Sequence, residues 1–285
     1  MKFKIGEKLH FYTVTESTQD NAKELLGKVQ NIEDVIHLVI VSGEQLRGRG
    51  RRGNLWYSPA GGLWCSVVLE PIVEKLYLQN AYQLSIVACI AVVESIENLY
   101  SLNLCIKWPN DIIYKDKKLG GVLVEVYPCY KNDAMFYFPI IGIGINVNNE
   151  IPMEVSKIAI SIKEILSYEV NVIELLTKLL RTFNHLYYDE YRSRGLTNLI
   201  HFYRKKNCII SRKIKVVDVE MDEDSGNVNR SAPVEGIVVD IDNDGKILLL
   251  TKNNSILKII SGHVVEDPGL SINESLKKEV CSVLC

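Results

Sequence analysis

The sequence lacks the features that mark several large classes of protein. Its formal net charge is only −2, so no global cationic field recruits nucleic acid. The start carries no apolar signal segment, and the longest apolar stretch, residues 84–93, is far too short to span a bilayer. No internal repeat or low-complexity linker interrupts the chain. We therefore expect a globular protein without a DNA or membrane partner.

The seven cysteines do not form paired motifs. Their number is odd, and no C-x-x-C spacing occurs. Cys65, Cys89 and Cys105 lie in apolar runs, which is typical of reduced core residues in a cytoplasmic protein. Cys281 and Cys285 are expected to be exposed and incidental. A hydrophobic content of 47% is enough for a full core.

The hydrophobic pattern predicts an α+β domain over residues 1–207. Ser17 is expected to cap a helix, and Asp20 to close a capping box with it. The other elements follow from apolar periodicity and from β-branched runs. Strands are expected at 35–41, 63–69, 104–108, 112–126 (a hairpin) and 136–147, and long helices at 79–100, 172–187 and 196–205.

After about residue 208 the pattern changes to short strands separated by polar turns. These strands are expected at 213–219, 234–241, 246–251 and 256–260. Several short strands at this spacing indicate a small barrel. The sequence therefore predicts a second, β domain over residues 208–267, followed by a polar tail over 268–285.

The segment R-G-R-G-R-R-G at 47–53 is the first of three with unusual polar composition. Its glycines allow a tight turn and a close approach to a ligand. Its arginines offer forked donors that suit phosphate and carboxylate. We expect a mobile loop that becomes ordered when it closes over an anion. A solvated surface turn or an RNA-binding patch would have a similar composition, so the loop alone leaves those alternatives open.

Two later segments add to this pattern. In K-W-P-N-D, Lys107 ends a core strand and places a cation at the rim of the sheet, with Asn110 and Asp111 at the turn. A lysine that is merely paired with a nearby carboxylate is the alternative. Gly142 and Gly144 alternate on one side of a strand and leave that face bare for a flat ligand. Close packing of sheet against helix would explain the same two glycines.

Five motifs together resemble those of the biotin protein ligase family in order and spacing. They are G-R-G-R-R-G at 48–53, W-Y-S-P at 56–59, K-W-P-N-D-I at 107–112, K-L-G-G-V-L-V-E at 118–125 and G-I-G-I-N-V-N at 142–148. The resemblance implies a class II aminoacyl-tRNA-synthetase/biotin-ligase-like catalytic domain with a mixed β-sheet and helices, followed by an SH3-like barrel. Only about ten residues precede the first element of the catalytic domain, so the chain resembles the monofunctional members without an N-terminal DNA-binding domain.

The activity that this resemblance implies is an ATP- and Mg²⁺-dependent ligation. Biotin would be activated to biotinyl-5′-AMP and then transferred to a lysine of the biotin carboxyl carrier protein domain of a carboxylase. Monomers and homodimers both fit. A lipoate protein ligase and a non-catalytic biotin-sensing regulator remain as alternatives. The arginine loop and the 107–111 motif argue against the first, and the mild net charge argues against the second.

The resemblance also assigns residues to biotin. Ser17, Thr18 and Gln45 would hydrogen-bond the ureido group and side chain of biotin. Gly120 and Gly121 would let the backbone meet the valeryl chain. Gln19 stands where the family often has asparagine, which leaves the role of this position open.

A second group of residues would act on the reacting anions. Gly48, Arg49 and Arg51 would close over the biotin carboxylate and the phosphate of ATP. Lys107 would bridge the carboxylate and the α-phosphate, contacting both substrates. By this resemblance the catalytic residues are Lys107, Arg51 and Arg49. Arg47 departs from the family pattern and would only add charge.

A third group would bind ATP together with Arg51 and Lys107. Trp56 would stack on adenine, and Asn146 would bond the edge of the base. Mg²⁺ would accompany ATP, but the resemblance does not assign its ligands. Asp111 is a candidate either for the metal or for orienting Lys107.

Overall fold

The computed structural model describes residues 4–72, 78–131, 134–221 and 232–271 of the 285-residue chain. Over 266–271 it describes the backbone alone. The chain divides into two compact units. The first comprises Met1–Ile106 and Asn110–Ser193, and the second comprises Lys107–Pro109 and Arg194–Cys285.

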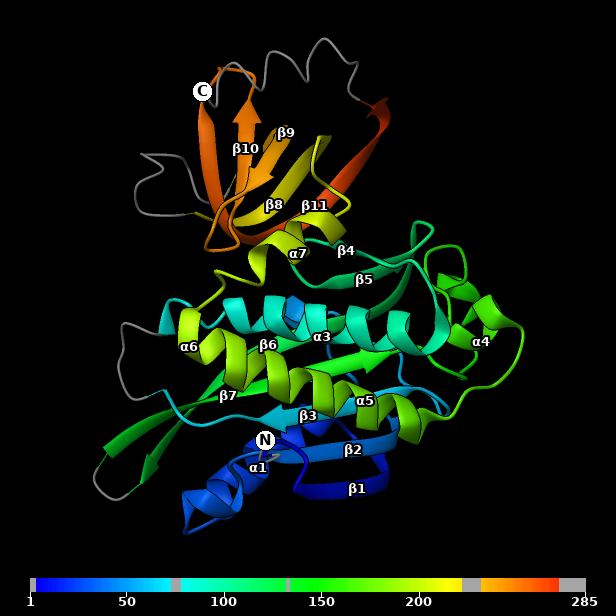
Figure 1. Ribbon diagram of the computed structural model, residues 1–285, viewed down its shortest axis with the longest axis vertical. Coiled ribbons are helices and arrows are strands. Elements are labelled where there is room, and N and C mark those ends of the chain that lie inside the picture. The colour runs from blue at the N-terminus through cyan, green and yellow to red at the C-terminus, as the bar shows by residue number, and fades with distance from the viewer. Residues whose placement is uncertain (1–3, 73–77, 132–133, 222–231, 272–285) are drawn as a thin grey trace. The chain divides into compact units, whose positions relative to one another are not determined.

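A seven-stranded mixed sheet forms the frame of the first unit, in the order β1-β2-β3-β7-β6-β5-β4 (Figure 1). Its strands are β1 (Lys8–Thr15), β2 (Leu38–Gln45), β3 (Leu63–Val68), β4 (Cys105–Lys107), β5 (Asp111–Tyr114), β6 (Lys117–Lys131) and β7 (Ala134–Ile145). The β1–β2 pair is parallel, whereas β2–β3, β3–β7, β6–β7 and β5–β6 are antiparallel. The expected α+β class with a mixed sheet is confirmed.

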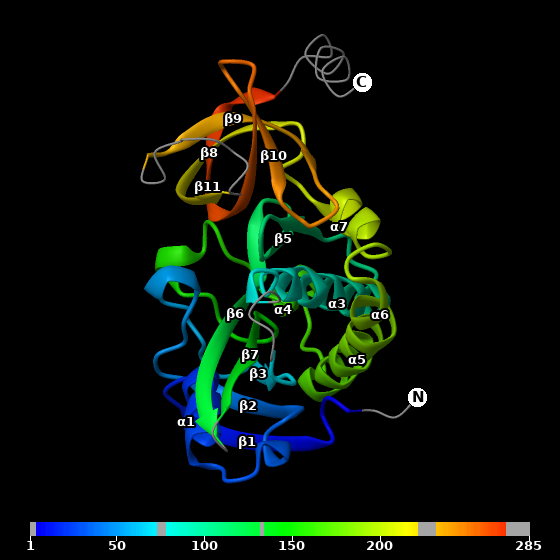
Figure 2. The same cartoon turned by 90° about the vertical axis from the view of Figure 1, so that its left-hand side faces the viewer.

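Helices cover both faces of this sheet (Figure 2). They are α1 (Thr18–Lys28), α3 (Gln83–Tyr100), α4 (Ile162–Leu166), α5 (Val172–Asn184) and α6 (Arg192–Arg194), with a π-helical segment (His185–Tyr191) after α5. α1 packs its Ala22 and Leu26 against Ile40, Phe138 and Ile140 of the sheet.

The core helix α3 lies on the opposite face from α1, together with α5 (Figure 2). By length and composition α3 alone among the described helices could cross a membrane, but most of it is buried in the protein. Its apolar sequence is therefore explained by packing. Cys65 of β3 and Cys89 of α3 are buried thiols, and burial raises the pKa of Cys65 to about 12.

Several element boundaries differ from those expected. The strand expected at 35–41 begins at Leu38, because Val35 to His37 form a turn in which His37 has a positive φ of 65°. The capping box predicted for Ser17 and Asp20 is wrong. Ser17 holds the N-cap position without a side-chain hydrogen bond, and the Asp20 carboxylate instead pairs with Arg49 at 2.7 Å.

The second unit contains a closed four-stranded barrel in the order β10-β11-β8-β9. The strands are β8 (Arg212–Met221), β9 (Val234–Ile241), β10 (Ile247–Thr251) and β11 (Ile256–Ser271). Ile214, Val238, Leu249 and Ile259 are buried members of its core. The expected small barrel is confirmed, and β11 runs past position 267. Most of the expected tail, 272–285, lies outside the described residues.

Helix α7 (Ile200–Lys206) belongs to the same unit as the barrel. Its Arg204 donates from Nη2 to Asn243 Oδ1 at 3.0 Å, and its Tyr203 hydroxyl donates to the Pro109 carbonyl at 2.9 Å. Trp108 Nε1 donates to the Gly245 carbonyl at 3.1 Å. These bonds hold α7 and 107–109 to the barrel within the second unit, and the domain boundary expected at 207/208 stays a prediction.

A partly buried carboxylate ties three segments of the first unit together. Glu70, just after β3, accepts hydrogen bonds from the hydroxyls of Tyr188 at 2.6 Å and Tyr187 at 3.3 Å, and from Arg192 Nη1 at 2.9 Å. His37 Nε2 lies 3.0 Å away. Burial alone would raise the pKa of Glu70, but the hydrogen bonds from His37 and Tyr188 outweigh it and lower this pKa to about 2.

This cluster predicts how stability depends on acid. The pKa of Glu70 falls from 4.5 to about 2 on folding, so its contribution is present above pH 4.5 and is lost as the pH falls toward 2. We expect Glu70→Gln to remove that pH dependence. Between pH 7 and pH 3 the wild type should lose about 2 kcal/mol more unfolding free energy than Glu70→Gln. Urea unfolding at both pH values measures this, with the exposed Glu154→Gln as control; equal losses would contradict the assignment.

Candidate active site

The candidate site lies on the sheet face that carries α1, where β7 presents two glycines. In the pairing register Gly142 stands between Ser66 of β3 and Leu123 of β6. The face is not left open. A Cβ added to Gly142 would lie 3.1 Å from Gln19 Cδ, and one added to Gly144 would lie 2.6 Å from Trp56 Nε1. The side chains of Gln19 and Trp56 therefore pack directly against the backbone of β7.

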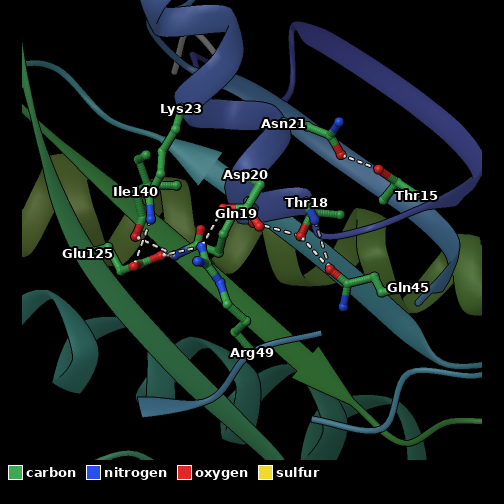
Figure 3. A network of polar contacts seen from close by, with 11 residues as sticks. Thr15, Thr18, Gln19, Asp20, Asn21, Lys23, Gln45, Arg49, Glu125 and Ile140 are labelled. Atoms are coloured by element: carbon green, nitrogen blue, oxygen red, sulfur yellow. Dashed lines mark hydrogen bonds and ion pairs between the residues drawn. The ribbon is translucent and has the colours of Figure 1, made fainter. Parts of the chain in front are cut away.

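The first turn of α1 and the end of β2 share a hydrogen-bond network (Figure 3). Gln45 Oε1 accepts from the Thr18 amide at 2.8 Å and from Thr18 Oγ1 at 3.1 Å. Thr18 Oγ1 lies 2.8 Å from Ser66 Oγ, and Gln45 Nε2 donates to Ser58 Oγ at 2.9 Å. Ser17 is buried beside Thr18. The structure thus brings together the three residues expected to bind the ureido group.

The arginine loop turns back on itself directly after this network. The Trp56 amide donates to the Gly48 carbonyl at 2.9 Å, and the Gly50 amide donates to the Asn54 carbonyl at 2.7 Å. A Cβ on Gly48 would lie only 2.4 Å from Ser58 Oγ and from the Trp56 carbonyl oxygen. Only glycine fits at this position without moving the backbone.

Two arginines of this loop pair with carboxylates. Arg49 Nη2 lies 2.7 Å from Asp20 Oδ1 and 3.4 Å from Glu125 Oε2. Arg47 Nε lies 3.2 Å from Glu16 Oε2, and both of these side chains are largely exposed. Arg49 is therefore drawn inward against α1 and β6, whereas Arg47 stays at the surface.

The third predicted arginine contacts the 107–111 motif. Arg51 Nη1 donates to Asn110 Oδ1 at 3.3 Å. Asn110 is itself fixed to β6, because its Nδ2 donates to the Val122 carbonyl at 2.5 Å and its carbonyl accepts from the Val122 amide at 3.0 Å. The loop and this turn thus meet through a side chain that sequence reasoning had placed at the turn without a role.

Lys118 is a site residue that the sequence reasoning missed. Its Nζ lies 2.7 Å from Asp111 Oδ1 and 4.9 Å from the centroid of the Trp56 ring. A Cβ added to Gly121 would meet both Asp111 Oδ1 and Lys118 Cε at 3.4 Å. The signal was present, since Lys118 opens the motif at 118–125, but only the glycines of that motif were used.

Comparison with known proteins gives the family. Residues 11–146 match the biotin/lipoate A/B protein ligase family, and residues 227–265 match the biotin protein ligase C-terminal domain. The bifunctional ligase/repressor BirA of Bacillus subtilis is 31% identical over 91% of this chain and 74% of that protein. The chain belongs to the biotin protein ligase family. It is an enzyme of the biotin ligase type, and its β domain is the C-terminal domain of that family.

Two further relatives agree with this biotin protein ligase assignment. The biotin–[acetyl-CoA-carboxylase] ligase of Mycobacterium tuberculosis is 26% identical over 88% of this chain and 87% of its own length. A solved biotin protein ligase from Aquifex aeolicus, in complex with biotin and ATP, superimposes with a TM-score of 0.74. It is 27% identical and covers 92% of this chain and 100% of its own.

The structure also places the predicted residues Gly120, Asn146 and Lys107. A Cβ on Gly120 would lie 2.8 Å from the Gly144 carbonyl oxygen, so this glycine serves close packing of the strands. Asn146 is buried, and its Oδ1 accepts from Asn149 Nδ2 at 3.2 Å. Lys107 ends β4 and is grouped with the second unit, so its catalytic role stays a prediction.

Three buried polar atoms of this site lack a hydrogen-bond partner. They are Gln19 Oε1, Arg49 Nε and Trp56 Nε1. Buried polar groups are almost always paired, so these three atoms are exceptions within the site. Within the described ranges no three His, Cys, Asp or Glu side chains are grouped to hold a metal ion.

The packing of Trp56 on β7 gives a direct test. Gly144→Ala would place a methyl group 2.6 Å from Trp56 Nε1, so the indole must move. We expect an altered near-UV circular dichroism signal and a loss of about 1–3 kcal/mol of stability. Gly121→Ala is the matched control on the neighbouring strand, because its new contacts would be ordinary at 3.4 Å. An unchanged spectrum for Gly144→Ala would contradict the packing.

Proposed function

We propose that this chain activates biotin with ATP to biotinyl-5′-AMP and transfers the biotin to a lysine of a biotin carboxyl carrier protein domain. The observation that carries the proposal is the convergence, on one sheet face, of an amide–hydroxyl network with several cationic side chains. The network suits an uncharged polar ring, and the cations suit two reacting anions. The family and its neighbour in complex with biotin and ATP support the same assignment.

The ureido ring of biotin is proposed to bind at Thr18, Gln45 and the neighbouring Ser17. A cyclic urea has both N–H donors and a carbonyl acceptor. An amide and two hydroxyls offer both kinds of partner. Thr18 and Gln45 are bonded to each other, Thr18 also to Ser66 and Gln45 also to Ser58, so their positions are fixed before a ligand arrives.

The chemical step brings the biotin carboxylate to the α-phosphate of ATP. Both are anions, so the attack requires cations that offset their repulsion and stabilise the charge that develops. Arg49, Arg51 and Lys118 supply this charge from the loop and from β6. Two lysines are candidates for bridging the biotin carboxylate and the α-phosphate. Lys107 is a candidate because of its motif, and Lys118 because of its contacts. No covalent enzyme intermediate is required.

The adenine ring is proposed to stack on Trp56, with Asn146 at its edge and Gly121 beneath the chain of biotin. Mg²⁺ would enter with ATP, bound mainly by phosphate oxygens as is usual for this ion. Asp111 is a carboxylate candidate for this ion, although it already pairs with Lys118.

The proposed macromolecular partner is the carrier domain of a biotin-dependent carboxylase, as the name of the mycobacterial relative suggests. We propose that the protein works in the cytoplasm, without a DNA or membrane partner. Either a monomer or a homodimer is compatible with this activity.

Single variants separate the two lysines. Pyrophosphate release from biotin, ATP and Mg²⁺ is the measurement. We expect Lys118→Ala to lower the rate by about 100-fold or more, because its ammonium lies against Trp56 and Asp111. Lys163→Ala, which breaks an exposed ion pair with Glu169, is the control. A normal rate in Lys118→Ala with an abolished rate in Lys107→Ala would assign the bridging role to Lys107.

Trp56→Ala tests the adenine site. We expect this variant to weaken binding of a non-hydrolysable ATP analogue far more than binding of biotin, because an indole face offers base stacking worth about 1–3 kcal/mol. Calorimetry with biotin alone, and then with the analogue, measures both. An equal loss for the two ligands would point to a structural role for Trp56.

A further inference from the structure

One carboxylate of the site contacts three side chains from two segments, the helix α1 and the arginine loop. Glu125 of β6 accepts from Lys23 Nζ at Oε1, at 2.8 Å, and from Gln19 Nε2 at Oε2, at 2.9 Å. Arg49 Nη2 lies 3.4 Å from the same Oε2. Figure 3 shows Lys23, Gln19 and Arg49 converging on Glu125. Neither the family motifs nor the proposed reaction gives this carboxylate a role.

The carboxylate fixes which way the Gln19 amide faces. Gln19 Nε2 donates to Glu125 and also lies 3.5 Å from the Ile140 carbonyl oxygen, so both contacts require the NH₂ group on this side. The reverse orientation would set two oxygens against Gln19 Oε1. Gln19 is 4% exposed, and its Oε1 has no partner. Gln19 Oε1, an acceptor without a partner, is therefore held in one orientation.

The Arg49 guanidinium is fixed in a similar way. Both of its ion pairs, with Asp20 at 2.7 Å and with Glu125 at 3.4 Å, use Nη2. Nε is buried and has no partner. Because the two carboxylates share one nitrogen, they orient the guanidinium without using all of its donors.

We propose that Glu125 is a positioning residue: it orients the Gln19 amide and, with Asp20, the Arg49 guanidinium, so that Gln19 Oε1 and Arg49 Nε meet a ligand as acceptor and donor. Such a pair suits a ligand that carries both an N–H group and an anionic oxygen. This inference rests on the proposed function, since biotin is the ligand used to test it.

A merely structural Glu125 would behave differently. It would tie α1 to β6 through Lys23, and its loss would lower stability without changing the affinity for substrate. A positioning Glu125 acts on affinity, because a glutamine here would offer an NH₂ group to Gln19 and favour the inverted amide. Its neutral side chain would also attract Arg49 less.

The test compares two substitutions of the same kind. Glu125→Gln removes the proposed positioning charge, and Glu16→Gln removes the carboxylate that pairs with Arg47 of the same loop at 3.2 Å. We expect Glu125→Gln to raise the KM for biotin in pyrophosphate release by about tenfold or more, because the loss of one charged hydrogen bond weakens binding by about this factor. Glu16→Gln should leave KM unchanged. An unchanged KM in Glu125→Gln, with a lowered Tm, would overturn the proposal.

Gln19→Leu and the double variant with Glu125→Gln show whether the effect passes through Gln19. If it does, the double variant should raise KM little beyond Gln19→Leu alone. Fully additive effects would remove Gln19 from the proposal.

Tryptic cleavage of the ligand-free protein at residues 47–53 tests the Arg49 contact without any substrate. Glu125→Gln and Asp20→Asn should be cleaved faster than the wild type and Glu16→Gln. Equal cleavage rates would remove Arg49 from the proposal. If the wild type itself releases no pyrophosphate, the proposed function fails, and this cleavage comparison still decides whether Glu125 holds the loop. Asp20→Asn serves here even if Glu125→Gln does not fold, because Asp20 is half exposed.

Discussion

The absence of two side chains on β7 is the constraint on which the rest of the site depends. With no Cβ at Gly142 and Gly144, Gln19 and Trp56 pack directly against the backbone of the strand. The first turn of α1 can therefore approach the sheet closely enough for Thr18 to reach Ser66. The chain after the arginine loop can likewise return to the sheet. Side chains at the two glycines would separate both segments from the floor of the site.

Two cationic side chains of the site form ion pairs with nearby carboxylates. Arg49 pairs with Asp20 and Glu125, and Lys118 pairs with Asp111. Each of these positive charges is therefore compensated locally before any ligand is present. This compensation also agrees with a nearly neutral chain, because the positive character is local. An incoming anion then exchanges contacts within an ordered set of charges, which costs less reorganisation than gathering mobile side chains would.

The sequence predicted what depends on short-range pattern and failed where distant segments meet. Apolar periodicity located most strands and helices and the small barrel, since each depends on neighbouring residues. Asp20 satisfied the local rule for a capping box, but an arginine far along the chain offers a stronger, charged partner. Lys118 was overlooked for a similar reason. Its contacts are with Asp111, which the β5–β6 register brings close, and with Trp56 from the chain after the arginine loop, and neither contact can be derived from one motif.

The order of the strands has a consequence for how the chain folds. The parallel pair β1–β2 is joined by α1, and β5, β6 and β7 follow one another as hairpins, so both pieces form from contacts close in sequence. Within the sheet the β3–β7 pairing joins them, through residues far apart in the chain. Closing long loops is entropically slow, so this pairing should form late in folding. Gly142 and Gly144 lie in that pairing, and the ligand-binding floor therefore exists only once the two halves of the sheet have met.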